Sequence, residues 1–162
     1  MRALLVMGAI GTEVFDLLAP SLGASDAFRL LSSYLQPSHQ RDVVFWLRPG
    51  DSEIAVAAVV DALPRSLALR VTSASEAEGV VRTRNGLRLV ASTTWSASSV
   101  SGGVIAVGPT APALSPDGRP VGQLAAANSG SALDEVLAYL EEHLSAGHRR
   151  TVATMLEYPV PD

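Results

Sequence analysis

Short apolar runs and amphipathic stretches alternate along the chain. Three runs have the length and the apolar or alternating pattern of strands: residues 2–9, 42–47 and 66–73. Two stretches with apolar side chains at helical spacing lie among them, residues 25–35 and 52–63. Pro37 and Pro64 end these two predicted helices, because proline removes a helical hydrogen bond. Strands that alternate with helices are typical of a mostly parallel sheet.

Less regular signals follow in the second half. Ser75 and Glu78 stand three residues apart, as in a capping box, and predict a short helix over 75–84 before the Asn85-Gly86 turn. Three further strands are expected over residues 87–95, 102–108 and 149–158. We therefore predict one α/β domain over residues 1–162, with a tail at 157–162. Its mostly parallel or mixed sheet has five to six strands, with helices on both faces.

The last long helix follows a run of small residues, AAANSG (125–130). Ser131 and Asp134 stand three apart, and a capping pair there predicts a helix over residues 131–144. Small residues before a helix N-terminus can hold an anion through free N–H groups, or they can let the backbone pack closely. Because capping accounts for Ser131 without a ligand, we favour close packing.

Composition excludes several classes of function. The chain contains no cysteine and no lysine, so disulfides, thiolate metal sites, a cysteine nucleophile and Schiff-base chemistry are excluded. The net charge is -4 and the arginines are scattered, which argues against nucleic-acid binding. No apolar run reaches the ~18 residues of a membrane span, and the N-terminus lacks the pattern of a signal peptide. We therefore expect a cytoplasmic protein without a cofactor.

Candidate catalytic side chains are few. Ser129 or Ser131 could act as a nucleophile with His143 or His148 as its base, although the turn motif G-x-S-x-G is absent. The two histidines are five residues apart, which makes a metal pair on one helix face unfavourable, so we expect no metal site. Trp95 ends a predicted strand and could wall a pocket or an interface. The pattern is incomplete for an enzyme.

Three segments resemble the thiolase-like superfamily, in particular β-ketoacyl synthases and their chain-length-factor partners. Residues 120–142 are similar to the ketosynthase segment in which a G-H-x-x-A-A-x-G turn leads to a long helix. Residues 23–47 and 67–91 resemble helix and strand segments of the same fold. The family's nucleophilic cysteine is missing, Gln123 replaces the histidine of the turn, and a ketosynthase is more than twice as long.

This resemblance implies a shortened, non-catalytic pseudo-subunit in acyl-chain or polyketide assembly. Such a protein would form a homodimer or a heterodimer, the latter with a ketosynthase-like partner. Gln123, Asn128 and Ser129 would then line a vestigial ligand site, and a helix over 27–35 would contribute to the dimer surface.

A rival resemblance is to the ThiJ/PfpI-type, glutamine-amidotransferase-like fold. Residues 92–95, 115–121, 129–144 and 156–159 resemble the C-terminal third of that family. Its nucleophile is also a cysteine, which this chain lacks. The resemblance implies a small-molecule-binding or hydrolytic protein, the latter with a serine site.

Overall fold

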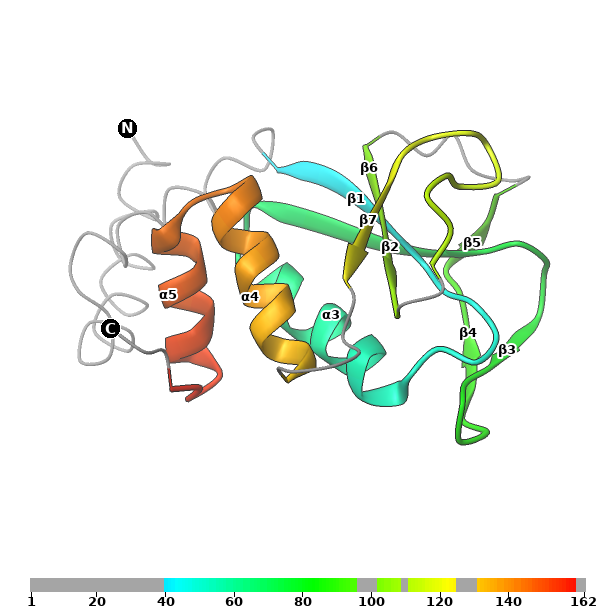
Figure 1. The fold of residues 1–162 in the computed structure, drawn as a ribbon, viewed down its shortest axis with the longest axis horizontal. Helices are drawn as coiled ribbons and strands as arrows, with labels where there is room; N and C mark the ends of the chain where they lie inside the picture. Colours follow the sequence, from blue (N-terminus) through cyan, green and yellow to red (C-terminus); the bar gives the residue numbers. More distant parts are fainter. Residues whose placement is uncertain (1–39, 96–101, 109–110, 125–130, 160–162) are drawn as a thin grey trace, which may run out of the picture.

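The computed structural model describes residues 40–95, 102–108, 111–124 and 131–159. The strand predicted over 2–9 and the helix predicted over 25–35 lie outside these residues. A five-stranded sheet runs through the described part (Figure 1). In spatial order its strands are β5 (Thr93–Thr94), β2 (Leu69–Ser75), β1 (Arg41–Trp46), β6 (Gly103–Val107) and β7 (Val121–Leu124), and all neighbours are parallel. The predicted α/β class is confirmed.

Helix α3 (Glu53–Arg65) connects β1 to β2. One stripe of it is buried, from Ala55 to Leu63, because its apolar residues recur at helical spacing. The returning strand pairs with β1 in register, with Arg41 opposite Leu69 and Trp46 opposite Ala74. This unit follows the prediction closely.

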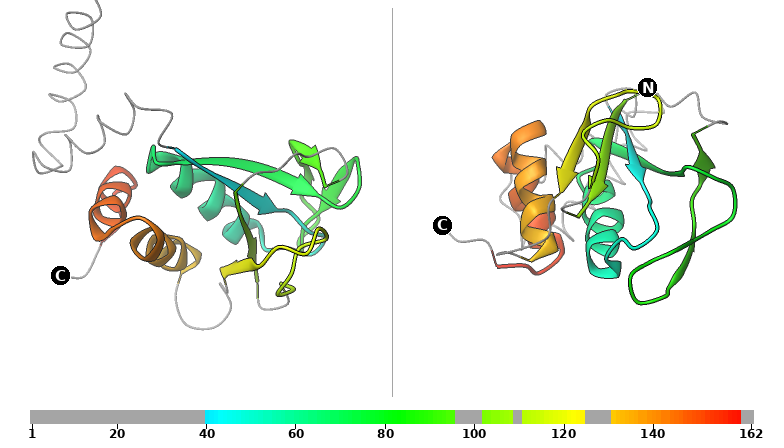
Figure 2. Two further views of the ribbon diagram at one scale, coloured as in Figure 1. Left: turned by 90° about the horizontal axis from the view of Figure 1, so that it is seen from above. Right: turned by 45° about the vertical axis from the view of Figure 1, so that its right-hand side comes forward.

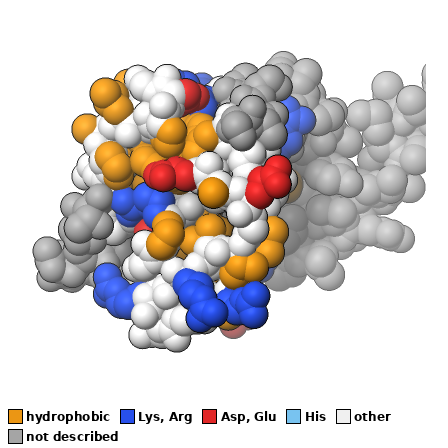
Figure 3. Space-filling view, turned by 90° about the vertical axis from the view of Figure 1, so that its right-hand side faces the viewer, with side chains coloured by type: hydrophobic (Ala, Val, Ile, Leu, Met, Phe, Trp, Pro, Cys, Tyr) orange, Lys and Arg blue, Asp and Glu red, His pale blue; other side chains and the backbone are white. Residues whose placement is uncertain are grey.

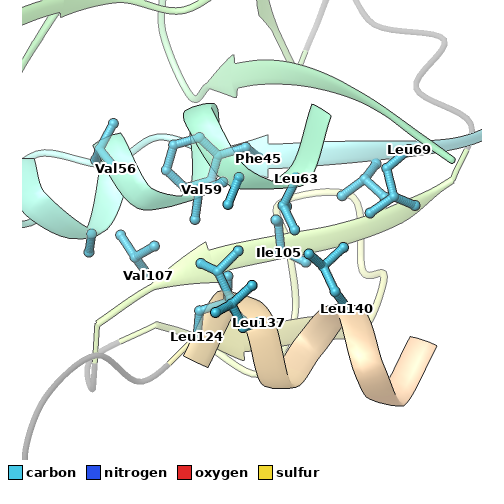
Figure 4. Close-up of a cluster of buried hydrophobic side chains, with 14 of the residues drawn as sticks. Phe45, Val56, Val59, Leu63, Leu69, Ile105, Val107, Leu124, Leu137 and Leu140 are labelled. Atoms are coloured by element: carbon cyan, nitrogen blue, oxygen red, sulfur yellow. The ribbon is translucent and has the colours of Figure 1, made fainter. Parts of the chain in front are cut away.

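Two further helices, α4 (Ala132–His143) and α5 (Ala146–Met155), pack beside α3. The predicted capping box of α4 is present: the Ser131 hydroxyl accepts from the N–H of Asp134, and the Asp134 carboxylate accepts from the N–H of Ser131. The three helices share one apolar core with alternate residues of the sheet, including Phe45 and Ile105 (Figure 4). They all cover the same sheet face in the described part of the chain.

The opposite sheet face has its own cluster. Trp46, Val104 and Ala106 point to this side, and Ala111 from the β6–β7 connection joins them. Trp95 and Val121 pack against the same cluster. Loops and strand ends supply this cover among the described residues, where the sequence had led us to expect helices.

A β-hairpin replaces the helix predicted over residues 75–84. Its strands β3 (Val80–Arg82) and β4 (Arg88–Val90) form a separate two-stranded sheet, which lies at the opposite end of the molecule from α4 and α5 (Figures 1 and 2). The Ser75 hydroxyl donates to the carbonyl of Ala77 and so does not cap a helix. Gly79 has a φ of 108°, which favours glycine and is incompatible with helix continuation.

The strand predicted over 87–95 is divided into β4 and β5. The strand predicted over 149–158 is wrong, because α5 spans most of that segment. Ser145 caps α5 by accepting from the N–H of His148, and the buried residues Gly147, Thr151 and Val152 fall on one helical face. None of the described helices combines the length and the apolar character that a membrane span requires.

Glu53 fixes the hairpin to the start of α3. Its carboxylate accepts hydrogen bonds from the Thr83 hydroxyl and from the backbone and side-chain N–H groups of Asn85, the last two at 2.7 Å. The hydrogen bond from Thr83, together with those from Asn85, lowers the pKa of Glu53 from its ordinary 4.5 to about 2. The ionised form therefore holds the hairpin in place.

Replacing Gly102 with alanine should destabilise the fold. Gly102 has a φ of 115°, and a Cβ there would lie 1.9 Å from the carbonyl oxygen of Asp42 on β1. We expect Gly102→Ala to lower the free energy of unfolding by roughly 2 kcal/mol or more. Gly103→Ala is the control, since a Cβ at Gly103 would meet nothing within 4 Å. Urea denaturation of both variants measures the difference, and equal losses would contradict the close approach.

The Glu53 contact should depend on pH. Because its folded pKa is depressed, its stabilising effect is complete above pH 4.5 and is lost as the pH falls toward about 2. Glu53→Gln should therefore be less stable than the wild type at neutral pH, and the difference in melting temperature should vanish near pH 2. Glu142→Gln, which removes an exposed carboxylate on α4, controls for net charge. A difference that persists unchanged at pH 2 would refute this assignment.

Candidate functional site

The strand order reverses direction at β1. From β1 the chain moves outward to β2 and β5, and it then returns to the other side of β1 with β6 and β7. In open parallel sheets, the strand ends on either side of such a reversal leave a crevice at the carboxyl edge, and ligands bind there. The residues that follow β1 and β6 are therefore the first candidates for a ligand site.

Arg48 and Asp51 lie at this position. The Asp51 carboxylate accepts from the backbone N–H of Arg48 at 2.9 Å and from its guanidinium at 3.1 Å. The same guanidinium nitrogen donates to the carbonyl oxygen of Val107, the last residue of β6, at 2.5 Å. Arg48 thus joins the carboxyl ends of β1 and β6 across the reversal.

This ion pair is buried. Only 5% of Asp51 is exposed, and burial raises the pKa of its carboxyl while the hydrogen bonds and charge of Arg48 lower it. The Arg48 guanidinium also lies over the ring of Trp46, 5.7 Å from its centroid. Trp95, which we predicted to wall a pocket or an interface, meets Trp46 edge-on with 5.9 Å between ring centroids. The ion pair and the two indole rings thus form a wall of contacting side chains at the carboxyl edge, of which only Trp46 lines the cavity described next.

A cavity of about 210 Å³ opens beside this wall. Trp46, Leu47 and Pro49 line it from the end of β1, and residues 75–78 with Val80 and Val81 line it from the other side. Trp46 is 3% exposed, and its indole Nε1 has no hydrogen-bond acceptor among the described residues. An unsatisfied buried donor is costly, and this N–H has no partner within the described residues.

A second cavity of about 470 Å³ lies between β7 and α4. Two predicted site residues, Gln123 and His143, line it together with Glu135, Tyr139 and Glu142. Both predicted residues already have partners: the Gln123 amide donates to the carbonyl of Ala111 at 2.6 Å, and the His143 ring stacks on Tyr139 with 4.0 Å between centroids.

Burial raises the pKa of Glu135 and also that of Tyr139, which is the more deeply buried of the two. These groups are far along α4 from the strand reversal. The second cavity is therefore separate from the first.

Within the described residues, Ser131, His143 and His148 do not assemble into one catalytic group. Ser131 caps the start of α4, where its hydroxyl contacts Asp134 at 3.0 Å and the Tyr158 hydroxyl at 2.7 Å. His143 ends the same helix, so about 18 Å of helix rise separates it from Ser131. His148 instead contacts the Ser145 hydroxyl at 2.9 Å.

Asn128 and Ser129 lie outside the described residues. The described ranges also hold no group of three or more histidine or carboxylate side chains arranged for a metal ion.

Comparison with known proteins places this geometry in a fold. No family model matches the chain, and no curated protein matches it. Among solved structures, oxidised DJ-1 of Toxoplasma gondii aligns with 74% of this chain and 100% of its own at 13% identity, with a TM-score of 0.55. The chain has the DJ-1/ThiJ/PfpI fold.

Two other solved structures agree. A ThiJ/PfpI family protein from Pseudomonas syringae aligns with 75% of this chain and 77% of its own, at 13% identity and a TM-score of 0.53. An AraC family transcriptional regulator from Pseudomonas putida aligns with 72% and 99%, at 19% identity and a TM-score of 0.53. At these identities the likeness shows the fold alone.

The rival resemblance is thus supported at the level of fold, and the thiolase-like resemblance is wrong. The expected ketosynthase-like role in polyketide assembly is therefore unsupported, since the solved neighbours are DJ-1 and ThiJ/PfpI proteins. The misleading signals were general ones. A small-residue turn before a capped helix, and helix followed by strand, occur in many α/β folds.

Sequence reasoning did not identify the Arg48–Asp51 pair. Ser52 occupies the N-cap position of α3 without a side-chain cap bond, and Asp51 turns back to Arg48. The only signal in the sequence was an aspartate close to an arginine in the short segment RPGD, residues 48–51.

Removing the Asp51 carboxylate should be far more damaging than removing an exposed one. Asp51→Ala leaves a buried guanidinium without its counter-charge, and we expect it to lower the free energy of unfolding by about 3 kcal/mol. Asp61 makes a comparable pair with Arg65 on the exposed side of α3, at 2.7 Å. Asp61→Ala should change the same quantity by about 0.5 kcal/mol or less. Equal effects in chemical denaturation would contradict the burial argument.

Proposed function

We propose that the chain is a small-molecule-binding protein of the DJ-1/ThiJ/PfpI fold, with its ligand in the cavity at the carboxyl edge of β1 and β2. The observation that carries this proposal is the 210 Å³ cavity beside the strand reversal, lined by a buried tryptophan with an unsatisfied N–H. Parallel sheets bind ligands at this edge because loops there can vary without disturbing the strands.

The cavity favours a small ligand that is neutral or cationic. Its volume is below the roughly 300–1,000 Å³ of sites for drug-sized molecules. Glu76 and Glu78 lie at its lining, so their charges disfavour an anion. Trp46 and Val81 supply apolar contact, and the Trp46 N–H calls for an oxygen or nitrogen acceptor on the ligand. A compact amine or alcohol has this combination of properties.

Binding is better supported than serine hydrolysis. Ser131 serves as a helix cap, and its hydroxyl contacts a carboxylate and a phenol but no histidine in the described structure. Nucleophilic catalysis requires a base within hydrogen-bond reach of the hydroxyl. The proposal therefore uses the cavity and assigns no nucleophile.

Tryptophan fluorescence can test the proposal directly. The chain has two tryptophans: Trp46 lines the cavity, and Trp95 contacts Trp46 edge-on. We expect a screen of small amines and alcohols to give saturable fluorescence changes and a higher melting temperature. Trp46→Phe removes the N–H and keeps an aromatic ring, so it should weaken binding about tenfold.

Tyr139→Phe is the matched control, because Tyr139 lines the second cavity. It should leave the affinity unchanged. Binding that survives Trp46→Phe but is lost in Tyr139→Phe would move the ligand to the cavity between β7 and α4. No binding by any compound of these classes would count against the proposed function.

A further inference from the structure

The β3–β4 hairpin has one face directed away from the core. Its cross-strand pairs are Val80 opposite Val90 and Arg82 opposite Arg88. All four side chains are exposed, whereas Val81, which alternates with them, is buried in the core. We call these four residues the outer hairpin face.

Its arginines are placed at a cost. Like charges directly opposite each other on a strand pair are destabilising, yet Arg82 and Arg88 occupy such positions. Arg84 on the adjoining turn adds a third guanidinium. None of the three makes a side-chain hydrogen bond or an ion pair with the described residues, although the chain as a whole carries a net charge of -4. The three guanidinium groups thus form no ion pair within the described residues, since the nearby Glu53 carboxylate is bound to Thr83 and Asn85.

Exposed aliphatic side chains accompany this charge. Val80, Leu87 and Val90 are 45%, 51% and 72% exposed. Figure 3 views this end of the molecule and shows hydrophobic side chains gathered with arginines on one face. An apolar patch rimmed by charge is typical of a surface that binds another protein.

The hairpin also has an open backbone edge. On the β3 side, the carbonyl of Arg82 accepts from Gly50 at 2.9 Å and the N–H of Arg84 donates to Asp51 at 3.0 Å, so that edge is covered. The N–H of Thr83 donates to the carbonyl of Leu87 across the hairpin. Because hydrogen-bonded and non-hydrogen-bonded residue pairs alternate along an antiparallel ladder, the N–H and C=O groups of Arg88 and Val90 point outward from β4. No strand in the described structure pairs with β4 on that side.

We propose that β4 accepts an extended segment of a protein partner as a third strand, in which an acidic and an aliphatic side chain stand two residues apart and so share one face. The backbone edge of Arg88 and Val90 supplies the ladder hydrogen bonds. Acidic side chains of the segment lie beside the arginines, and aliphatic ones lie beside the valines. This inference rests on the β4 edge and the arginines, which do not line the ligand cavity, although Val80 belongs to both surfaces.

Other occupants fit less well. A second copy that paired through β4 would gather the arginines of both chains on one face, and residues 80–90 contain no carboxylate to balance them. A nucleic acid or an anionic membrane would use the arginines but leave the open backbone edge unused. Only an acidic extended peptide uses charge, aliphatic contacts and edge together.

Fluorescence anisotropy with short labelled peptides tests this proposal on the full chain. We expect a valine–glutamate peptide with the repeat Glu-Thr-Val-Thr, which puts both residue types on one face, to bind. The matched valine–lysine peptide with the repeat Lys-Thr-Val-Thr should not bind. Backbone N-methylation of the valine–glutamate peptide should weaken binding by about tenfold or more, because it removes ladder hydrogen bonds. Arg82→Gln with Arg88→Gln should weaken it by a similar factor. Arg150→Gln, on exposed α5, is the matched control and should change the affinity less than about twofold.

Three results would overturn the proposal. Equal binding of the N-methylated and unmodified peptides would show attraction by charge without strand addition. Binding of a single-stranded oligonucleotide or of phosphatidylserine vesicles, abolished by the arginine substitutions while the peptide does not bind, would assign the face to that anion. Sedimentation that shows a dimer broken by Arg82→Gln with Arg88→Gln would assign it to a second copy.

Discussion

Strand β1 has to be apolar on both faces and paired along both edges. Five successive side chains, from Val43 to Leu47, are almost completely buried, and β2 and β6 take its two edges. Each such side chain contributes roughly 1.5–3 kcal/mol by leaving water. Val43, Phe45 and Leu47 belong to the core beneath the helices, and Trp46 belongs to the cluster on the opposite face. The two cores, the strand reversal and the position of Arg48 all depend on this strand.

Gly102 is required by the same pairing of β1 with β6. The start of β6 comes so close to Asp42 that no Cβ fits between them. Close approach of the two strands at one end allows Arg48 to reach the Val107 carbonyl at the other. Gly102, which has no side chain, and Arg48, which has a long one, therefore lie at the two ends of the same strand pair.

The sequence was sufficient for the elements whose local and tertiary preferences agree. Strand β1, helix α3 and the capping box of α4 follow from apolar periodicity and from Ser131 with Asp134. It failed for α5, whose threonine and valine favour strands but whose Ser145 cap and helical burial decide otherwise. It failed at Ser75 as well, because the spacing of a capping box also occurs at the end of a strand.

The candidate site was harder to predict because it is not local. Arg48, Val107 and Trp95 come from separate segments, and only the strand order brings them together. Gln123 and His143 line one cavity, although the periodicity of a strand and of a helix contains nothing about their common wall. Hydrogen bonds across a sheet edge carry no signature in sequence spacing.

The helix layer has a consequence for synthesis of the chain. Helix α3 packs against α4 and α5, which are synthesised after it. During translation the β1–α3–β2 unit can form early from neighbouring residues, since its contacts are close in sequence. The apolar stripe of α3, which includes Val59 and Leu63, stays uncovered until residues 132–155 have left the ribosome. A nascent chain halted before that point exposes a surface that chaperones bind and that promotes aggregation.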